Sequence, residues 1–218
     1  SPPVWIQKSL PEEWPERGID AHESGGIYLE WEPNNESNIQ AYHIYRAEYF
    51  ELNDSLGEFE IITRTVTILD RNLTYTDPGV WTSKVYSYKL KAEDISENLS
   101  SDSDLKSYSL LPQIQVNTMA PNGITIRLNS DRRLSWNYDY NIEMEDYCIT
   151  IIQDPDDPVL RQKLSPQNYT DGAESWSIPD SIILEPNAIY KWRIDTGANY
   201  VDKVESKGSE STWATFIY

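Results

Sequence analysis

The 218-residue chain carries 36 acidic and 18 basic side chains, which gives a formal net charge of −18. A field of that sign repels phosphates, so neither nucleic acid nor an anionic lipid surface is expected as a partner. Hydrophobic residues make up 39% of the chain, with 8 Trp and 15 Tyr against 3 Phe and 2 Met, which favours thin β-sandwich cores over helical bundles. The single cysteine, Cys148, excludes an internal disulfide framework, and no apolar run approaches the roughly 18 residues that cross a bilayer.

Short stretches of alternating apolar and polar residues, separated by Pro, Gly, Asn and Asp, predict β-strands along the whole chain. They lie at 27–32, 42–45 and 85–92 in the first half, and at 134–137, 147–150 and 189–195 in the second. Alternation assigns every second residue to a core face. The residues expected to point inward are Ile27, Leu29, Trp31, Tyr42, Ile44, Tyr86, Tyr88, Leu90, Ala92, Leu134, Trp136, Tyr147, Ile149, Tyr190, Trp192 and Ile194.

The two halves repeat one pattern, with a Trp near the end of one strand and a Tyr opening the next. Such a repeat predicts two similar domains. Serine-rich, acidic sequence precedes Leu110-Leu111-Pro112, and Pro112 interrupts regular pairing there. We therefore expect an all-β chain of two consecutive antiparallel β-sandwich domains, at 1–110 and 111–218.

The first half resembles a fibronectin type III domain. The resemblance rests on Trp31, Tyr42, Tyr75-Thr76-Asp77 and the run Tyr86-Ser87-Tyr88-Lys89-Leu90-Lys91-Ala92. It implies a tyrosine corner, in which a buried Tyr hydroxyl bonds back to the turn before its strand. Tyr86 is the candidate in this half and Tyr190 in the other. The second half, through 184–194 and 209–216, is similar more loosely to fibronectin-like or immunoglobulin-like domains of bacterial cell-surface proteins.

The sequence contains little material for catalysis, and we assign no catalytic residue, no cofactor and no metal ligand. His43 lies on the predicted outward face of its strand and His22 in a loop, so both are expected to be ordinary surface histidines. Cys148 lies mid-strand without a basic neighbour, which favours a structural or partly covered thiol. The acidic clusters at 101–104 and 154–157 match no calcium loop, so solvated loops are the preferred interpretation over calcium sites.

Five aromatic residues fall in segments that alternation does not assign to a core: Trp5, Trp14, Tyr49, Phe50 and Trp81. Aromatic side chains anchor protein partners and stack on sugars, so Trp14, Tyr49 and Trp81 are the candidate contact residues. The alternative is that Trp5 and Trp14 cover the open end of the first sandwich.

The resemblance implies a non-catalytic, extracellular or cell-envelope module that binds or assembles through loops and edge strands, with a protein or polysaccharide of the cell surface as partner. The rival hypothesis is a carbohydrate-binding accessory module of a larger secreted hydrolase. The opening Ser1-Pro2-Pro3 suits the segment after a lipidated cysteine, so an N-terminal lipid anchor is the one membrane attachment expected. Five glycosylation sequons, at Asn35, Asn53, Asn72, Asn98 and Asn168, are consistent with a eukaryotic secreted protein instead.

Overall fold

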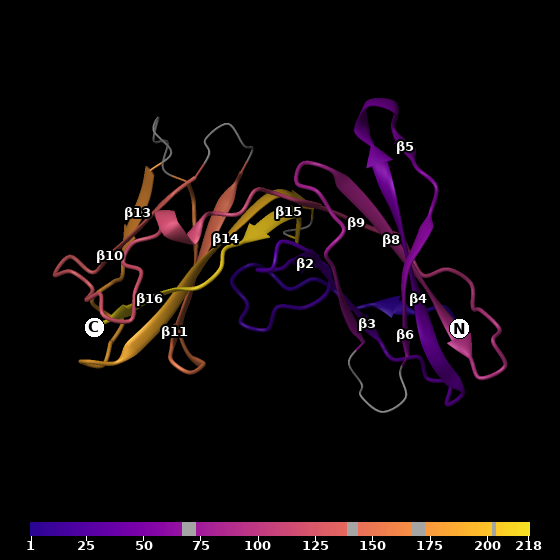
Figure 1. Ribbon diagram of the computed structural model, residues 1–218, viewed down its shortest axis with the longest axis horizontal. Coiled ribbons are helices and arrows are strands. Elements are labelled where there is room, and N and C mark those ends of the chain that lie inside the picture. Colours follow the sequence, from indigo (N-terminus) through magenta and orange to yellow (C-terminus); the bar gives the residue numbers. More distant parts are fainter. Residues whose placement is uncertain (67–72, 139–143, 167–172, 202–203) are drawn as a thin grey trace. The chain divides into compact units, whose positions relative to one another are not determined.

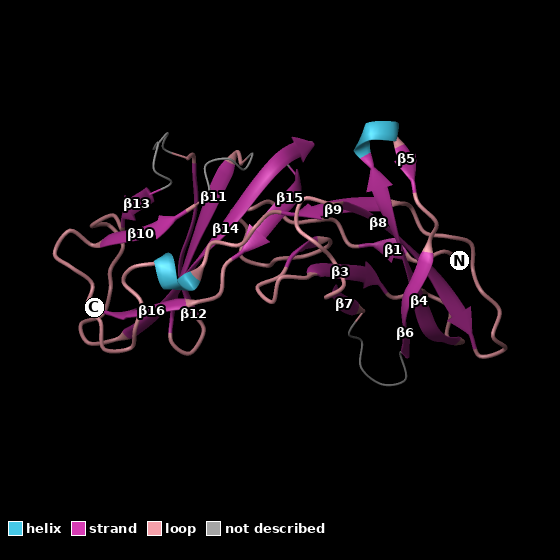
Figure 2. Ribbon diagram, turned by 45° about the horizontal axis from the view of Figure 1, so that its top comes forward, coloured by secondary structure: helices cyan, strands magenta, loops and turns pink. Residues whose placement is uncertain are grey.

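The computed structural model describes residues 1–66, 73–138, 144–166, 173–201 and 204–218, so the sequons at Asn72 and Asn168 lie outside the described residues. In those residues the chain is built of antiparallel strands with two short 3-10 helices (Figures 1 and 2). It forms two compact units. Unit 1 comprises Ser1–Ser9 and Pro15–Leu110, and unit 2 comprises Leu10–Trp14 and Leu111–Tyr218. No helix within the described residues is long and apolar enough to cross a membrane.

Unit 1 is a sandwich of two antiparallel sheets. In the first sheet, β3 (Ile27–Glu32) pairs with β7 (Thr74–Asp77) and with the short strands β1 (Val4–Trp5) and β2 (Asp20–Ala21). The second sheet is centred on the long strands β4 (Ile39–Phe50) and β8 (Val85–Asp94). Its remaining strands are β5 (Ser55–Leu56), β6 (Glu60–Val66) and β9 (Lys106–Leu110), and η1 (Glu51–Asn53) joins β4 to β5.

The core of unit 1 lies between these sheets. Ile27, Leu29 and Trp31 of β3 are buried, and the Trp31 ring meets Tyr42 of β4 edge-on with 5.6 Å between centroids. All the inward-facing residues predicted for this half are buried, which confirms the alternation. A pleated strand sends alternate side chains to one face, so a buried face leaves that period in the sequence.

Unit 2 repeats the arrangement. One sheet pairs β10 (Arg133–Asn137) with β13 (Ala173–Ser177). The other sheet contains β11 (Asp146–Gln153), β12 (Asp157–Leu164), β14 (Ile189–Val201), β15 (Val204–Glu210) and β16 (Ala214–Ile217). β14 pairs with β11 along one edge, and with β16 and then β15 along the other. The short η2 (Val116–Thr118) precedes β10. The core holds Trp136 and Trp192, together with the other inward residues predicted for this half.

Both units contain the predicted tyrosine corner. The Tyr86 hydroxyl accepts a hydrogen bond from the Trp81 backbone N–H at 3.1 Å, five residues earlier. In unit 2 the Tyr190 hydroxyl accepts one from the Glu185 N–H at 2.6 Å, with the same spacing. Two sandwiches with paired sheets and these corners have the architecture of fibronectin type III and immunoglobulin-like domains, which confirms the predicted fold class.

Candidate functional site

The β4–β5 hairpin of unit 1 extends beyond the other strands of its unit (Figures 1 and 2). β4 continues past its pairing with β8 at Tyr49 and Val85, and there pairs with β5 through Tyr49–Leu56 and Phe50–Ser55. The turn closes locally: the Tyr49 hydroxyl donates to the Asp54 carboxylate at 2.5 Å, and Asp54 has a positive φ of 47°. The hairpin therefore has a defined conformation held by its own contacts.

Three apolar side chains are exposed on this hairpin. Leu52 in η1 is fully exposed, and Phe50 and Leu56 are about two-fifths exposed. Single exposed apolar residues are ordinary on protein surfaces, but three of them on one projecting hairpin expose apolar area that a partner can bury. The tip thus has the composition of a protein-contact surface.

The sequence of the hairpin carries charge of one sign. Between residues 47 and 63 the chain has five carboxylates, at Glu48, Glu51, Asp54, Glu58 and Glu60, and no Lys or Arg. Lys84 from the loop before β8 pairs with Glu48 at 2.8 Å. A negative surface around an apolar centre attracts a basic partner surface and repels phosphate groups.

The three predicted contact residues lie in different places. Tyr49 is on the hairpin, beside Phe50. Trp81 lies in the loop between β7 and β8 and is 72% exposed. Trp14 is 41% exposed and belongs to unit 2, whereas Trp5 is buried in the unit 1 core. Leu52 and Leu56 were not among the predicted contact residues, because only aromatic residues were considered as candidates. The one sign of exposed leucines in the sequence is that both lie in an acidic segment.

His43 is not an ordinary surface histidine. Its ring Nε2 contacts the Glu93 carboxylate, and its side chain is mostly covered. Glu93 also accepts hydrogen bonds from Arg64 and Gln40, each at 2.7 Å. Arg64 comes from β6 and Glu93 from β8, so the alternation of β4 by itself could not indicate this cluster. The bonds from Arg64, then those from His43, lower the pKa of Glu93 to about 2, so this cluster is held together as an ion pair network.

His22 lies in a turn as expected. Its ring Nδ1 contacts the Ser24 hydroxyl at 2.8 Å and accepts the Ser24 backbone N–H at 3.1 Å. His22 and Ser24 lie two positions apart in the same loop. The backbone of His22 also forms hydrogen bonds with the backbone of Gly25 and Gly26. The contact shapes the turn.

In each acidic cluster considered for calcium, one carboxylate pairs with lysine. Asp102 contacts Lys89 at 2.9 Å and Lys91 at 3.3 Å, and Lys89 is the main cause of the lowered pKa of Asp102. Asp154 contacts Lys191 at 2.5 Å. A carboxylate that faces an ammonium group in this way is a poor calcium ligand, because the cation would have to displace the lysine.

Cys148 is more covered than sequence analysis indicated. It is 3% exposed although alternation places it on the outer face of β11, and its thiol donates to the backbone carbonyl of Pro11 at 3.1 Å. The covering residue lies 137 positions away in the sequence, so no local pattern predicts this burial.

The sequence matches no protein-family model and no curated protein. Among solved structures, the chain is similar to the FN1–FN3 domains of chicken CNTN1, with 16% identity and a TM-score of 0.35. The alignment covers 100% of this chain and 68% of that one. This TM-score is too low to assign the fold. The fold of the chain is assigned from its strands, their pairing and the tyrosine corners.

Proposed function

We propose that this chain is a non-catalytic protein-binding module that acts through the β4–β5 hairpin of unit 1. The observation that carries the proposal is the fully exposed Leu52, with Phe50 and Leu56 beside it on a projecting hairpin. Burying a Leu or Phe side chain is worth about 1.5–3 kcal/mol, so three such residues can supply the centre of an interface.

The chemistry of the hairpin indicates the kind of partner. An apolar centre in an acidic segment fits a protein surface with an apolar recess and Lys or Arg at its rim. Attraction between the acidic segment and a basic rim speeds association, and dissolved salt screens that attraction. Binding should therefore weaken as salt is added. The proposed setting is the outside of a cell or the cell envelope, as a bacterial surface protein.

Edge strands offer a second mode of contact for the same module. β6 pairs with β4 on one side, and within the described residues no strand pairs with its other side. Its β-branched residues and exposed Ile61 suit addition of a further strand, while Arg64 and Glu60 place charges along it. Self-assembly of the module would use this edge, and sedimentation that depends on concentration would reveal it.

A bait experiment tests the hairpin. The whole chain and a double variant, Phe50→Ser with Leu52→Ser, are used to capture proteins from the envelope and medium fractions of the source cells, with quantification by mass spectrometry. The matched control is Ile183→Ser, which removes an apolar side chain that is 86% exposed in unit 2. We expect at least one protein to be captured by the chain and the control, and to fall at least tenfold with the hairpin variant. Equal capture by all three would refute the hairpin as the contact.

Trp81 supports the second candidate, a carbohydrate-binding module. It is 72% exposed, and an exposed indole face can stack on a sugar ring. Retention of the chain on immobilised polysaccharides, lost in Trp81→Ala and Trp14→Ala but unchanged in the hairpin variant, would favour this function over protein binding.

A further inference from the structure

The outer face of the larger sheet of unit 2 carries an ordered set of polar side chains. Tyr147, Ile149 and Ile151 of β11 face the core, so Cys148 and Thr150 face outward. The strand register aligns two rows across this face. One row is Lys163, Cys148, Asp195 and Glu210, and the other is Arg161, Thr150 and Arg193. Short side chains on β11 thus lie between long charged ones on β12 and β14.

A segment from near the N-terminus lies on this face. Residues Leu10–Trp14, here called the strap, belong to unit 2 although their neighbours in sequence belong to unit 1. The carbonyl of Pro11 accepts a hydrogen bond from Arg161 Nε at 2.6 Å and one from the Cys148 thiol at 3.1 Å. The Arg161 side chain is 6% exposed. A buried guanidinium that donates to a carbonyl makes a charge-assisted bond, which is stronger than a neutral one.

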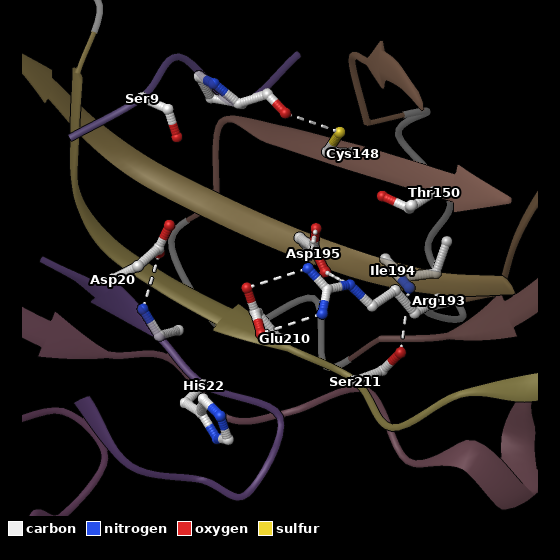
Figure 3. Close-up of polar contacts among 12 residues, drawn as sticks. Ser9, Asp20, His22, Cys148, Thr150, Arg193, Ile194, Asp195, Glu210 and Ser211 are labelled. Atoms are coloured by element: carbon white, nitrogen blue, oxygen red, sulfur yellow. Dashed lines mark hydrogen bonds and ion pairs between the residues drawn. The ribbon is translucent and has the colours of Figure 1, made fainter. Parts of the chain in front are cut away.

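Contacts with neighbouring side chains hold the Arg161 guanidinium in the position from which it binds the Pro11 carbonyl. Arg161 also donates to the Thr150 hydroxyl at 3.0 Å and pairs with Asp195 at 3.3 Å. Asp195 contacts Arg193 at 3.1 Å, and Arg193 forms two bonds to Glu210, at 3.1 and 3.3 Å (Figure 3). A side chain held from several directions loses less entropy when it binds a ligand, so the donor group is preorganised.

The strap has the features of a bound peptide. Its turn is closed by its own groups, because the Glu13 N–H donates to the Leu10 carbonyl at 2.9 Å and the Leu10 N–H to the Glu13 carboxylate at 3.1 Å. It lies in no strand, and Glu12, Glu13 and Trp14 are exposed. Its described bonds to the sheet run through one carbonyl group. A compact turn whose described bonds to the sheet use this one acceptor can be replaced by another peptide that offers the same acceptor.

We propose that the outer face of unit 2 is a peptide-binding site that the chain fills with its own strap. Its ligand class is a short acidic turn of the form Leu-Pro-Glu-Glu-Trp, in which the carbonyl of the proline binds Arg161 and Cys148. The tethered strap has an effective concentration of the order of millimolar, so a separate peptide competes only at similar concentration or after the strap has left. This site is independent of the hairpin function.

Cys148 is the only cysteine, so its rate of reaction with a thiol reagent reports whether the face is covered. We compare the whole chain with a variant whose residues 10–14 are replaced by Gly-Ser-Gly-Ser-Gly, with near-ultraviolet circular dichroism as the check on folding. Labelling should be at least tenfold faster in the variant. A peptide with the sequence of residues 9–15, added at millimolar concentration, should restore protection, and a scrambled peptide of the same composition should not.

Further variants test the proposal if the chain with residues 10–14 replaced does not fold. Glu13→Gly removes the carboxylate that closes the turn of the strap and should accelerate labelling at least threefold, while the matched control Ile183→Ser should label at the rate of the unaltered chain. Arg161→Lys in the strap-replaced chain should abolish protection by the peptide. Labelling that is equally slow with and without the strap would overturn the proposal, and so would a folded, strap-replaced chain that no concentration of peptide up to several millimolar protects.

Discussion

The carboxylate of Asp77 is buried in unit 1 and accepts four described hydrogen bonds. It lies at the end of β7, is 2% exposed, and accepts bonds from Arg46 at 2.9 and 3.1 Å, from the Tyr88 hydroxyl at 3.0 Å and from the Gly79 N–H at 2.9 Å. Asp77→Asn keeps the shape but removes the charge and turns an acceptor into a donor. The new amide N–H2 would face groups that themselves donate.

The expected loss of stability is large. Removing one partner of a buried ion pair costs about 3–5 kcal/mol, because the other charge remains buried. The Arg46 side chain is 21% exposed, so water compensates part of that cost and about 3 kcal/mol is expected. A domain of this size has a total stability of about 5–15 kcal/mol, so the variant should still fold but unfold at clearly lower urea concentration.

Amide hydrogen exchange in a urea series, read by mass spectrometry, measures each unit separately. Peptides from β4 and β8 should lose protection at lower urea in Asp77→Asn, while those from β14, which belongs to a separate core, serve as the internal reference. A double-mutant cycle with Arg46→Met should give a coupling of at least about 1 kcal/mol. A coupling below about 0.5 kcal/mol would refute the reasoning, since the two charges would then act independently.

Other changes give graded effects. Gly18→Ala should cost about 2 kcal/mol in thermal denaturation, because Gly18 has φ +84° and a Cβ would lie 2.6 Å from a backbone nitrogen. Gly57→Ala should cost less than about 1 kcal/mol, because Gly57 has no positive φ and the nearest atoms to a Cβ there lie 3.3 Å away; equal losses at both glycines would contradict this distinction. Tyr190→Phe should destabilise unit 2 by about 1–2 kcal/mol in urea, because the Glu185 N–H loses its acceptor; an unchanged midpoint would show that the corner bond contributes nothing. The pKa of Glu93 falls from 4.5 unfolded to about 2 folded, so its contribution is present above pH 4.5 and is lost as the pH falls towards 2; Glu93→Gln should flatten the stability profile of unit 1 in that range, and parallel profiles would exclude this role.

The alternating pattern was sufficient to predict the fold because each unit buries apolar side chains between two sheets. Trp31 and Trp136 are buried as expected, and the corners at Tyr86 and Tyr190 form with the same five-residue spacing. These features depend on the strand period and on contacts within a few residues of each other, which are the two kinds of information that a sequence carries directly.

The candidate sites were predicted only in part. Tyr49 lies on the hairpin proposed as the contact, but its exposed neighbours Leu52 and Leu56 gave no aromatic signal. The proposed peptide site was not predicted at all, because its donors come from separate strands. Alternation predicts that the side chains of Cys148 and Arg193 point away from the core, and side chains that do so are normally expected to be exposed to solvent.

Hydrophobic burial imposes a local period on each strand, so the strands, the faces they bury and the two-sandwich architecture could be predicted from the sequence. The contacts on the outer faces depend on the tertiary structure. There the strap covers Cys148, Glu93 joins His43 to Arg64, and lysines pair with Asp102 and Asp154. These contacts join residues far apart in the chain, and a polar side chain on an outer face carries no periodic signal of what will lie against it.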